Sequence, residues 1–125
     1  MTARVLVTGS RTWRDRAAVT DALDGLLAEH GALTVVHGAC PTGADAMAHK
    51  WALNGRMILR TAAVSEPHPP DWQRHGKRAG VVRNAEMVAL GADVCLAFIR
   101  DSSPGASNCA LLARRAGIPV QRYTA

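Results

Sequence analysis

Five short apolar runs alternate along this chain with segments of helical spacing, and that alternation limits the available folds more than any other feature. Short connections between a strand, a helix and the next strand bring the strands side by side in parallel, with helices on both faces. The sequence therefore predicts an α/β, Rossmann-like three-layer sandwich with a five-stranded parallel sheet in the order 3-2-1-4-5. The expected strands are residues about 4–8, 33–37, about 56–62, 93–99 and 118–124.

The helices expected between these strands carry start and stop signals. In residues 12–31 apolar side chains recur at helical spacing, and Gly31 is a stop. Residues 64–76 hold three prolines and are expected to be irregular. No segment has the composition of a linker or a repeat, so residues 1–125 are expected to form one domain. The other helices are expected from Thr42 through the Ala-rich segment, from about Lys77 to Leu90, and within 108–117.

Composition excludes some classes of protein. A hydrophobic share of 48% and a charged share of 20% are ordinary for a globular chain. No apolar run reaches the ~20 residues of a membrane span, and the first residues lack the apolar core and cleavage site of a secretory signal. The three cysteines, Cys40, Cys95 and Cys109, have no zinc-type spacing. These features predict a cytoplasmic protein with reduced thiols and no membrane partner.

The net charge of +5, from 15 basic and 10 acidic residues, suits an anionic partner. A nucleotide and a nucleic acid both fit that description. Because the basic residues are spread along the chain, charge alone does not choose between them.

Three strand-to-helix turns are rich in small residues: 8–12, 38–45 and 101–108. The carboxyl ends of parallel strands meet at one edge of a sheet, where ligands bind. Each turn precedes a helix, whose free N–H groups and dipole favour an anion, and a glycine lets phosphate oxygens approach the backbone. The sequence predicts a phosphate-bearing ligand, with Gly9, Gly43 and Gly105 converging at a common rim. Candidate binding residues in the turns are Gly9, Ser10, Arg11, Gly38, Gly43, Asp45, Ser103, Gly105 and Ser107.

Asp45 has a structural and a functional interpretation. Thr42 and Asp45 match a capping box, in which the threonine caps the helix and the acid reaches back to it. Asp45 also shares a helical face with His49. The set His37, Cys40, Asp45 and His49 has no recognised zinc spacing, so neither a metal nor a cofactor is predicted.

The helix expected over 77–90 places charges inside an apolar arc, because Arg83 and Glu86 fall between its apolar residues at ~100° per residue. A buried charge needs a partner. One interpretation is an ion pair between the two; the other is that Arg83 reaches a ligand phosphate and Glu86 orients it or acts on a ribose. Asn84 can read polar edges, and Lys77 lies near the start of the helix, where an anionic ligand would compensate its charge.

Four stretches together resemble a known family: VTGSRTW, VVHGACPTGADAMA, DWxRxGKRAGVVRNAEMV and SPGASNCALLARRAGIPV. They are similar to the YspA-like, cpYpsA-related branch of the SLOG superfamily, which also holds DNA-processing protein A and the Lonely Guy phosphoribohydrolases. The resemblance covers nearly the whole chain. It implies a Rossmann-like fold that binds a nucleotide or a nucleotide-derived ligand, such as a nucleotide-sugar or an ADP-ribose derivative.

The resemblance also assigns roles to residues. It places Gly9, Ser10 and Arg11 in a first phosphate-side turn, Gly38, Gly43 and Asp45 in a second, and Lys77, Arg83, Asn84 and Glu86 in a central helix motif. Ser103, Pro104, Gly105 and Ser107 stand where Lonely Guy enzymes carry P-G-G-x-G-T-x-x-E. Here the chain reads P-G-A-S-N-C-A, without the later glycines and the catalytic glutamate.

Three functions follow in order of preference. The first is a module that senses a nucleotide or nucleotide-sugar. The second is a nucleotide N-glycosidase of Lonely Guy type, with Glu86 or Asp45 as its catalytic acid or base. The third is binding of single-stranded DNA, ranked last because aromatic stacking platforms are scarce. By analogy with related folds, a homodimer or higher oligomer is expected.

Overall fold

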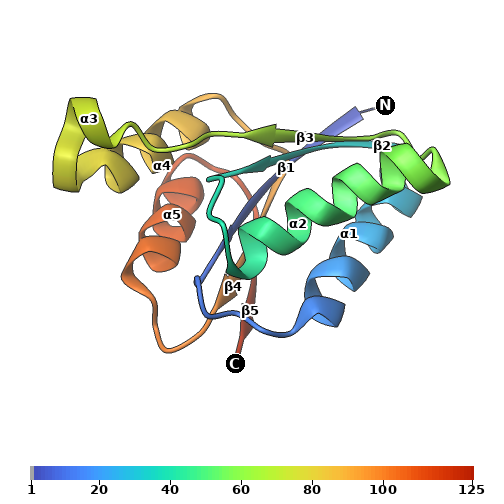
Figure 1. Cartoon of the computed structure of the whole chain (residues 1–125), viewed down its shortest axis with the longest axis horizontal. Helices are drawn as coiled ribbons and strands as arrows, with labels where there is room; N and C mark the ends of the chain where they lie inside the picture. Colours follow the sequence, from blue (N-terminus) through green and yellow to red (C-terminus); the bar gives the residue numbers. More distant parts are fainter. Residues whose placement is uncertain (1) are drawn as a thin grey trace.

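The computed structural model describes residues 2–125 and contains one sheet of five parallel strands (Figure 1). The strand order is β3-β2-β1-β4-β5, which confirms the predicted order. Each neighbouring pair is parallel, from β2–β3 at one edge to β4–β5 at the other. The strands are β1 (Thr2–Gly9), β2 (Ala32–His37), β3 (Ala63–Pro67), β4 (Val94–Ile99) and β5 (Val120–Thr124).

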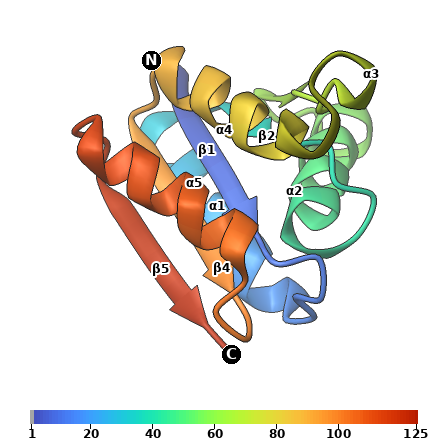
Figure 2. The same cartoon turned by 90° about the vertical axis from the view of Figure 1, so that its left-hand side faces the viewer.

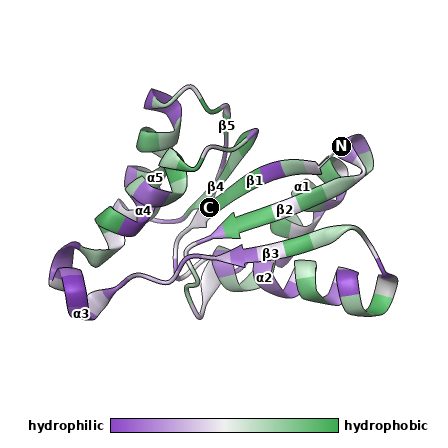
Figure 3. Cartoon of the chain, turned by 90° about the horizontal axis from the view of Figure 1, so that it is seen from above, coloured by the Kyte–Doolittle hydropathy of each residue, from purple (hydrophilic) through white to green (hydrophobic). Residues whose placement is uncertain are grey.

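Helices cover both faces of the sheet, as predicted for a three-layer sandwich. Helices α1 (Arg16–His30) and α2 (Gly43–Asn54) lie on one face, and α4 (Ala79–Ala89) and α5 (Pro104–Arg115) on the other (Figure 3). The short helix α3 (Trp72–His75) lies to one side of the sheet (Figure 1). No helix within residues 2–125 combines the length and the apolar character that crossing a membrane requires.

The core consists of two apolar layers, one on each face of the sheet. Strand β4 is buried along its whole length, as expected of a strand covered on both sides. On the α1/α2 face the ring of Trp13 packs against Phe98, with their centroids 5.5 Å apart. The strand residues of this layer include Val5, Val7, Leu33, Val35 and Leu96, and those of the opposite layer include Leu6, Val36 and Cys95.

The ends of the helices follow local chemistry. Asp15 precedes α1 and its carboxylate accepts a hydrogen bond from the backbone N–H of Ala18. Gly31 ends α1 in the left-handed conformation, so the predicted stop is confirmed. Helix α5 begins at Pro104, earlier than expected, because proline at the first helical position needs no N–H partner.

The strand predicted at 56–62 is wrong. Residues Gly55–Leu59 continue from α2 as one π-helical turn, and the third strand is Ala63–Pro67. The apolar pair Met57 and Ile58, which suggested a buried strand, is 77% and 72% exposed. The true strand is a short, partly polar edge strand, so its pattern is weak. Part of the stretch expected to be irregular, 64–76, therefore belongs to β3 and α3.

The amino end of α2 lies very close to the turn after β1. A methyl group added to Gly9 would overlap the side chain of Ala44, and one added to Gly43 would overlap the carbonyl oxygen of Ser10. Gly43 also has a φ of 76°, which side chains rarely adopt. The two glycines therefore allow the contact that brings the loops after β1 and β2 together.

We predict opposite effects for two Gly→Ala substitutions. Gly9→Ala forces an added methyl group into packed atoms and should lower the free energy of unfolding by about 1–3 kcal/mol. Gly25→Ala lies in α1, where nothing is within 4 Å of the new carbon, and should raise it by up to about 1 kcal/mol through helix propensity. Urea denaturation measures both. Equal effects would show that α2 does not approach β1 as described.

Candidate functional site

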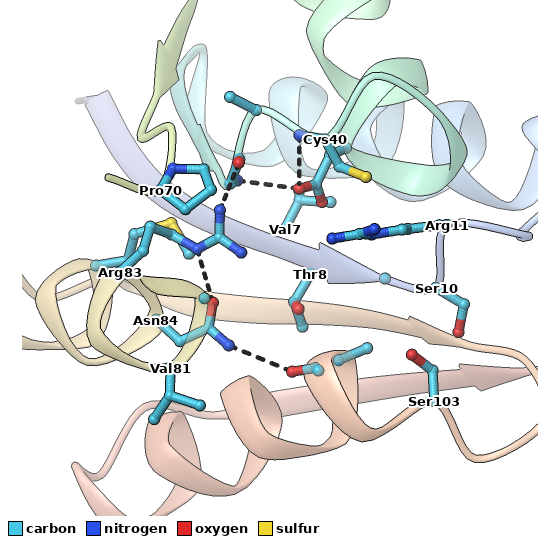
Figure 4. Close-up of a pocket in the computed structure, with 18 of the residues that line it drawn as sticks. Val7, Thr8, Ser10, Arg11, Cys40, Pro70, Val81, Arg83, Asn84 and Ser103 are labelled. Atoms are coloured by element: carbon cyan, nitrogen blue, oxygen red, sulfur yellow. Dashed lines mark hydrogen bonds between the residues drawn. The ribbon is translucent and has the colours of Figure 1, made fainter. Parts of the chain in front are cut away.

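A crevice of about 640 Å³ opens at the carboxyl ends of the central strands. Its walls come from the turn after β1, the loop after β2, the segment around α3, helix α4 and the start of α5 (Figure 4). Its volume lies in the range of sites for small ligands. It occupies the position expected in such sheets, beside β1, where the strand order reverses.

Most of the residues proposed from the sequence line this crevice. Gly9 and Gly105 are on its wall, whereas Gly43 packs behind the turn after β1 and does not line it. Ser107 and Glu86 are also absent from the lining. The proposed residues that do line it are Gly9, Ser10, Arg11, Gly38, Asp45, Lys77, Arg83, Asn84, Ser103 and Gly105.

The structure corrects the placement of Glu86. Its side chain is exposed, and the buried side of α4 is instead formed by Ala79, Asn84, Met87 and Val88. The salt bridges found among residues 2–125 do not include a pair between Arg83 and Glu86, so the ion-pair interpretation is wrong. Apolar residues occur on several sides of this short helix, so the sequence alone did not fix which side faces inward.

Arg83 connects the walls of the crevice. Its Nη1 donates to the carbonyl oxygens of Gly38, in the loop after β2, and of His68, before α3 (3.3 Å to His68). Its Nε donates to Oδ1 of Asn84 at 2.8 Å. The amide of Asn84 in turn donates to the carbonyl oxygen of Gly105 at 3.3 Å (Figure 4). One chain of hydrogen bonds thus runs from the loop after β2 to the start of α5.

Gly38 leaves room for the Arg83 contact. A methyl group added at position 38 would overlap the guanidinium of Arg83, so that a larger residue here would displace this side chain.

Asp45 does not form the predicted capping box. Helix α2 has no side-chain cap at Thr42, whose hydroxyl donates to the carbonyl oxygen of Arg11 at 3.0 Å. Instead Oδ2 of Asp45 accepts from the backbone N–H groups of Gly38 (3.1 Å) and Cys40 (3.4 Å). The sequence matches the capping-box motif, but the carboxylate of Asp45 binds the loop before the helix and not the cap residue.

The other carboxylate oxygen of Asp45, Oδ1, is buried and has no hydrogen-bond partner among residues 2–125. Burial raises the pKa of this carboxyl from 3.8 to about 6. The hydrogen bonds from Cys40 and Gly38 and the charges of Arg83 and Arg11 act in the opposite direction. Asp45 is therefore protonated over a wider range of pH than an exposed aspartate.

The first three N–H groups of the loop after β2 are already occupied. Those of Gly38 and Cys40 are bound by Asp45, and that of Ala39 donates to Nδ1 of His37 at 3.0 Å. The loop is an anion-binding concavity filled by the protein's own carboxylate.

Two other turns at the crevice offer groups for an external anion. The first is the turn after β1, where the exposed guanidinium of Arg11 has no hydrogen bond or salt bridge within the described part of the chain. The second is the first turn of α5, whose N–H groups have no partner within the helix, and where Ser103 makes no capping bond. Ser10, in contrast, uses its hydroxyl on the backbone of Arg100, accepting at 2.8 Å and donating at 3.1 Å.

Sequence reasoning missed the apolar part of the crevice. Pro70, Trp72 and Val81 line it, and the last two are 52% and 54% exposed. A tryptophan inside a Pro-rich segment could have indicated an exposed aromatic side chain. Because such a segment has no hydrophobic periodicity, the sequence did not show which way that side chain faces. Cys40 also lines the crevice as a half-buried free thiol.

His37 and His49 lie outside the crevice lining and converge on a serine. The Ala39 N–H occupies Nδ1 of His37, so the proton is on Nε2, which donates to Oγ of Ser65 at 2.8 Å. Oγ of Ser65 also makes a hydrogen bond with Nδ1 of His49, at 2.7 Å. Within residues 2–125 no three His, Cys, Asp or Glu side chains are grouped so that they could share a metal ion.

A family model, described as the YspA, cpYpsA-related SLOG family, matches residues 3–75. The Gene 61 protein of Mycobacterium phage D29 is 51% identical over 121 residues, which cover 96% of this chain and 95% of the phage protein. Two crystal structures of the C-terminal domain of a hydrogenase from Pyrococcus furiosus match at 14% identity. Their TM-scores are 0.47 and 0.48, with 96% and 97% of this chain and 90% and 91% of those chains covered.

We predict that Asp45 makes stability fall as pH rises. A raised native pKa means that the native state keeps its proton longer than the unfolded chain, so stability is lost between about pH 4 and pH 7. A change from 3.8 to about 6 corresponds to up to about 3 kcal/mol. The Asp45→Asn variant keeps an oxygen for the loop N–H groups but has nothing to ionise.

The difference in free energy of unfolding between Asp45→Asn and the wild type isolates this effect. The wild-type profile alone does not, because burial lowers the pKa of His37 to about 4. The titration of His37 therefore makes the free energy of unfolding rise with pH over the same range. The difference should grow in favour of the variant from pH 4 to pH 7. A difference that does not vary with pH would mean that Asp45 is not buried as described.

Proposed function

This chain belongs to the YspA, cpYpsA-related SLOG family, and from that membership and the chemistry of the crevice we propose that it binds a nucleotide or nucleotide-derived ligand as a sensor. Nucleotide-sugars and ADP-ribose-like molecules are the ligands we favour. The observation that carries the proposal is a crevice of ligand size, lined by three cationic side chains and one carboxylate: Arg11, Lys77, Arg83 and Asp45.

The charge balance supports an anionic ligand. With Asp45 ionised the side chains lining the crevice carry a net positive charge, and protonation of Asp45 makes it larger. The planar guanidinium of Arg11 suits two phosphate oxygens at once. The first turn of α5 adds unpaired N–H groups and the positive end of a helix dipole. We assign the ligand phosphate to the space between Arg11 and the start of α5.

A nucleotide N-glycosidase is the second candidate, and one observation favours it. Asp45 is a buried carboxyl in the crevice whose pKa of about 6 suits general acid–base chemistry near neutral pH. The absence of a glutamate at the position that matches the Lonely Guy motif, together with the exposed position of Glu86, favours binding over catalysis. By analogy with related folds, we also propose that the protein forms a homodimer or a higher oligomer. Analytical ultracentrifugation measures this oligomeric state.

We predict that Arg11→Gln weakens the binding of ADP-ribose about tenfold or more, because a charged hydrogen bond to phosphate contributes about 1.5–3 kcal/mol. Arg14→Gln is the matched control: it removes the same charge from an exposed neighbour that does not line the crevice. Isothermal titration calorimetry at fixed salt gives both constants. Equal losses in the two variants would point to bulk charge, and no binding by the wild type would refute the proposal.

The enzyme candidate makes a separate prediction. Incubation with adenosine 5′-monophosphate, followed by chromatography, should release adenine at a rate that Asp45→Asn reduces by at least about 100-fold, the scale of one general acid or base. If the wild type binds the nucleotide and releases no base, the sensor stands and the glycosidase fails.

A further inference from the structure

We propose that the α3 side of the crevice is a subsite for an aromatic base, in which Trp72 stacks on the ring. This inference rests on the proposed function and narrows its ligand class. The ligand is then a nucleotide that keeps its base, and not a base-free sugar phosphate.

The exposure of Trp72 is the first observation. It is 52% exposed and lines the crevice, whereas Trp13 is 3% exposed in the core. The indole N–H of Trp51 is bound to Asp24 at 2.8 Å, while that of Trp72 has no hydrogen bond within residues 2–125. A large apolar ring left open inside a concave site is what a flat aromatic ligand would cover.

Two further apolar side chains line the same crevice as Trp72. Pro70 precedes it in the lining, and Val81 of α4, 54% exposed, contributes a second apolar side chain. Figure 4 shows Pro70 and Val81 at one end of the crevice and Arg11 and Ser103 at the other. Arg83 lies beside Pro70, so the apolar side chains share their end with a cation, but its guanidinium is already bound to Gly38, His68 and Asn84. An aromatic base fits the end that holds the apolar side chains, and a phosphate fits the end that holds Arg11.

The backbone of the segment that carries Trp72 is anchored. The backbone N–H of His68 donates to the carbonyl oxygen of His37 at 2.8 Å, and Arg83 binds the carbonyl oxygen of His68. The carboxylate of Asp71 caps α3 by accepting from the N–H of Arg74 at 3.1 Å. Less backbone conformational entropy is then lost when a ligand binds against this segment.

The test uses three probes and three variants. The probes are adenosine 5′-monophosphate, ribose 5-phosphate and adenosine, and binding is followed by calorimetry and by quenching of tryptophan fluorescence. The variants are Trp72→Ala, Trp72→Phe and the control Leu111→Ala, which removes an exposed apolar side chain of α5 outside the crevice. Thermal melts establish that each variant is folded.

Trp72→Ala should weaken adenosine 5′-monophosphate about tenfold or more, the effect of losing one stacked base, and leave ribose 5-phosphate within about twofold. Trp72→Phe should recover most of the loss, and Leu111→Ala should change nothing. Unchanged nucleotide affinity in Trp72→Ala would overturn the subsite. An equal loss for nucleotide and sugar phosphate would overturn it too, because the tryptophan would then only support the crevice.

The probes also separate this inference from the proposed function. If ribose 5-phosphate does not bind but adenosine quenches fluorescence in a Trp72-dependent way, the base subsite stands and the phosphate site fails. If ribose 5-phosphate binds and the base adds no affinity, the phosphate site stands and the subsite fails. Binding of none of the three probes refutes both.

Discussion

The guanidinium of Arg83 holds the crevice together. From α4 it reaches the carbonyl oxygens of Gly38 and His68, and through Asn84 it is linked to the start of α5. These segments are far apart in the sequence but meet at the carboxyl edge of the sheet (Figure 2). Because a guanidinium has five N–H donors in a rigid plane, one side chain can fix several segments at once. The positions of the loop after β2 and of Trp72 therefore depend on the same group.

Arg83 and Asp45 both bind the backbone of Gly38. Gly38 gives its carbonyl oxygen to the arginine and its N–H to the carboxylate. The loop after β2 is thereby fixed by the protein's own charges, and the N–H groups of Gly38 and Cys40 are bound to Asp45. We therefore propose the turn after β1 and the start of α5 as the site of the anion, and the apolar side chains near α3 as the site of the group that the anion is attached to.

The fold could be predicted from the sequence because the alternation of apolar strand-like runs with segments of helical spacing recurs along the whole chain. Parallel strands and their helices bury whole apolar runs, and Gly31 ends a helix as its local chemistry requires. The prediction of the third strand failed because a short edge strand buries little apolar surface, while the apolar Met57 and Ile58 lie in an exposed turn. For the site, glycines and cations marked the correct edge. Asp45 binds the loop that precedes its own helix, a contact that the capping-box motif does not describe. The inward side of α4 depends on its packing against the rest of the chain, which its short apolar pattern does not specify.

The most direct measurement is a crystal structure of the chain bound to adenosine 5′-monophosphate. The account predicts the phosphate between Arg11 and the first turn of α5, the base against Trp72, and the N–H groups of Gly38 and Cys40 still bound to Asp45. A nucleotide seated outside the crevice, or a phosphate that displaces Asp45 from the loop after β2, would contradict it.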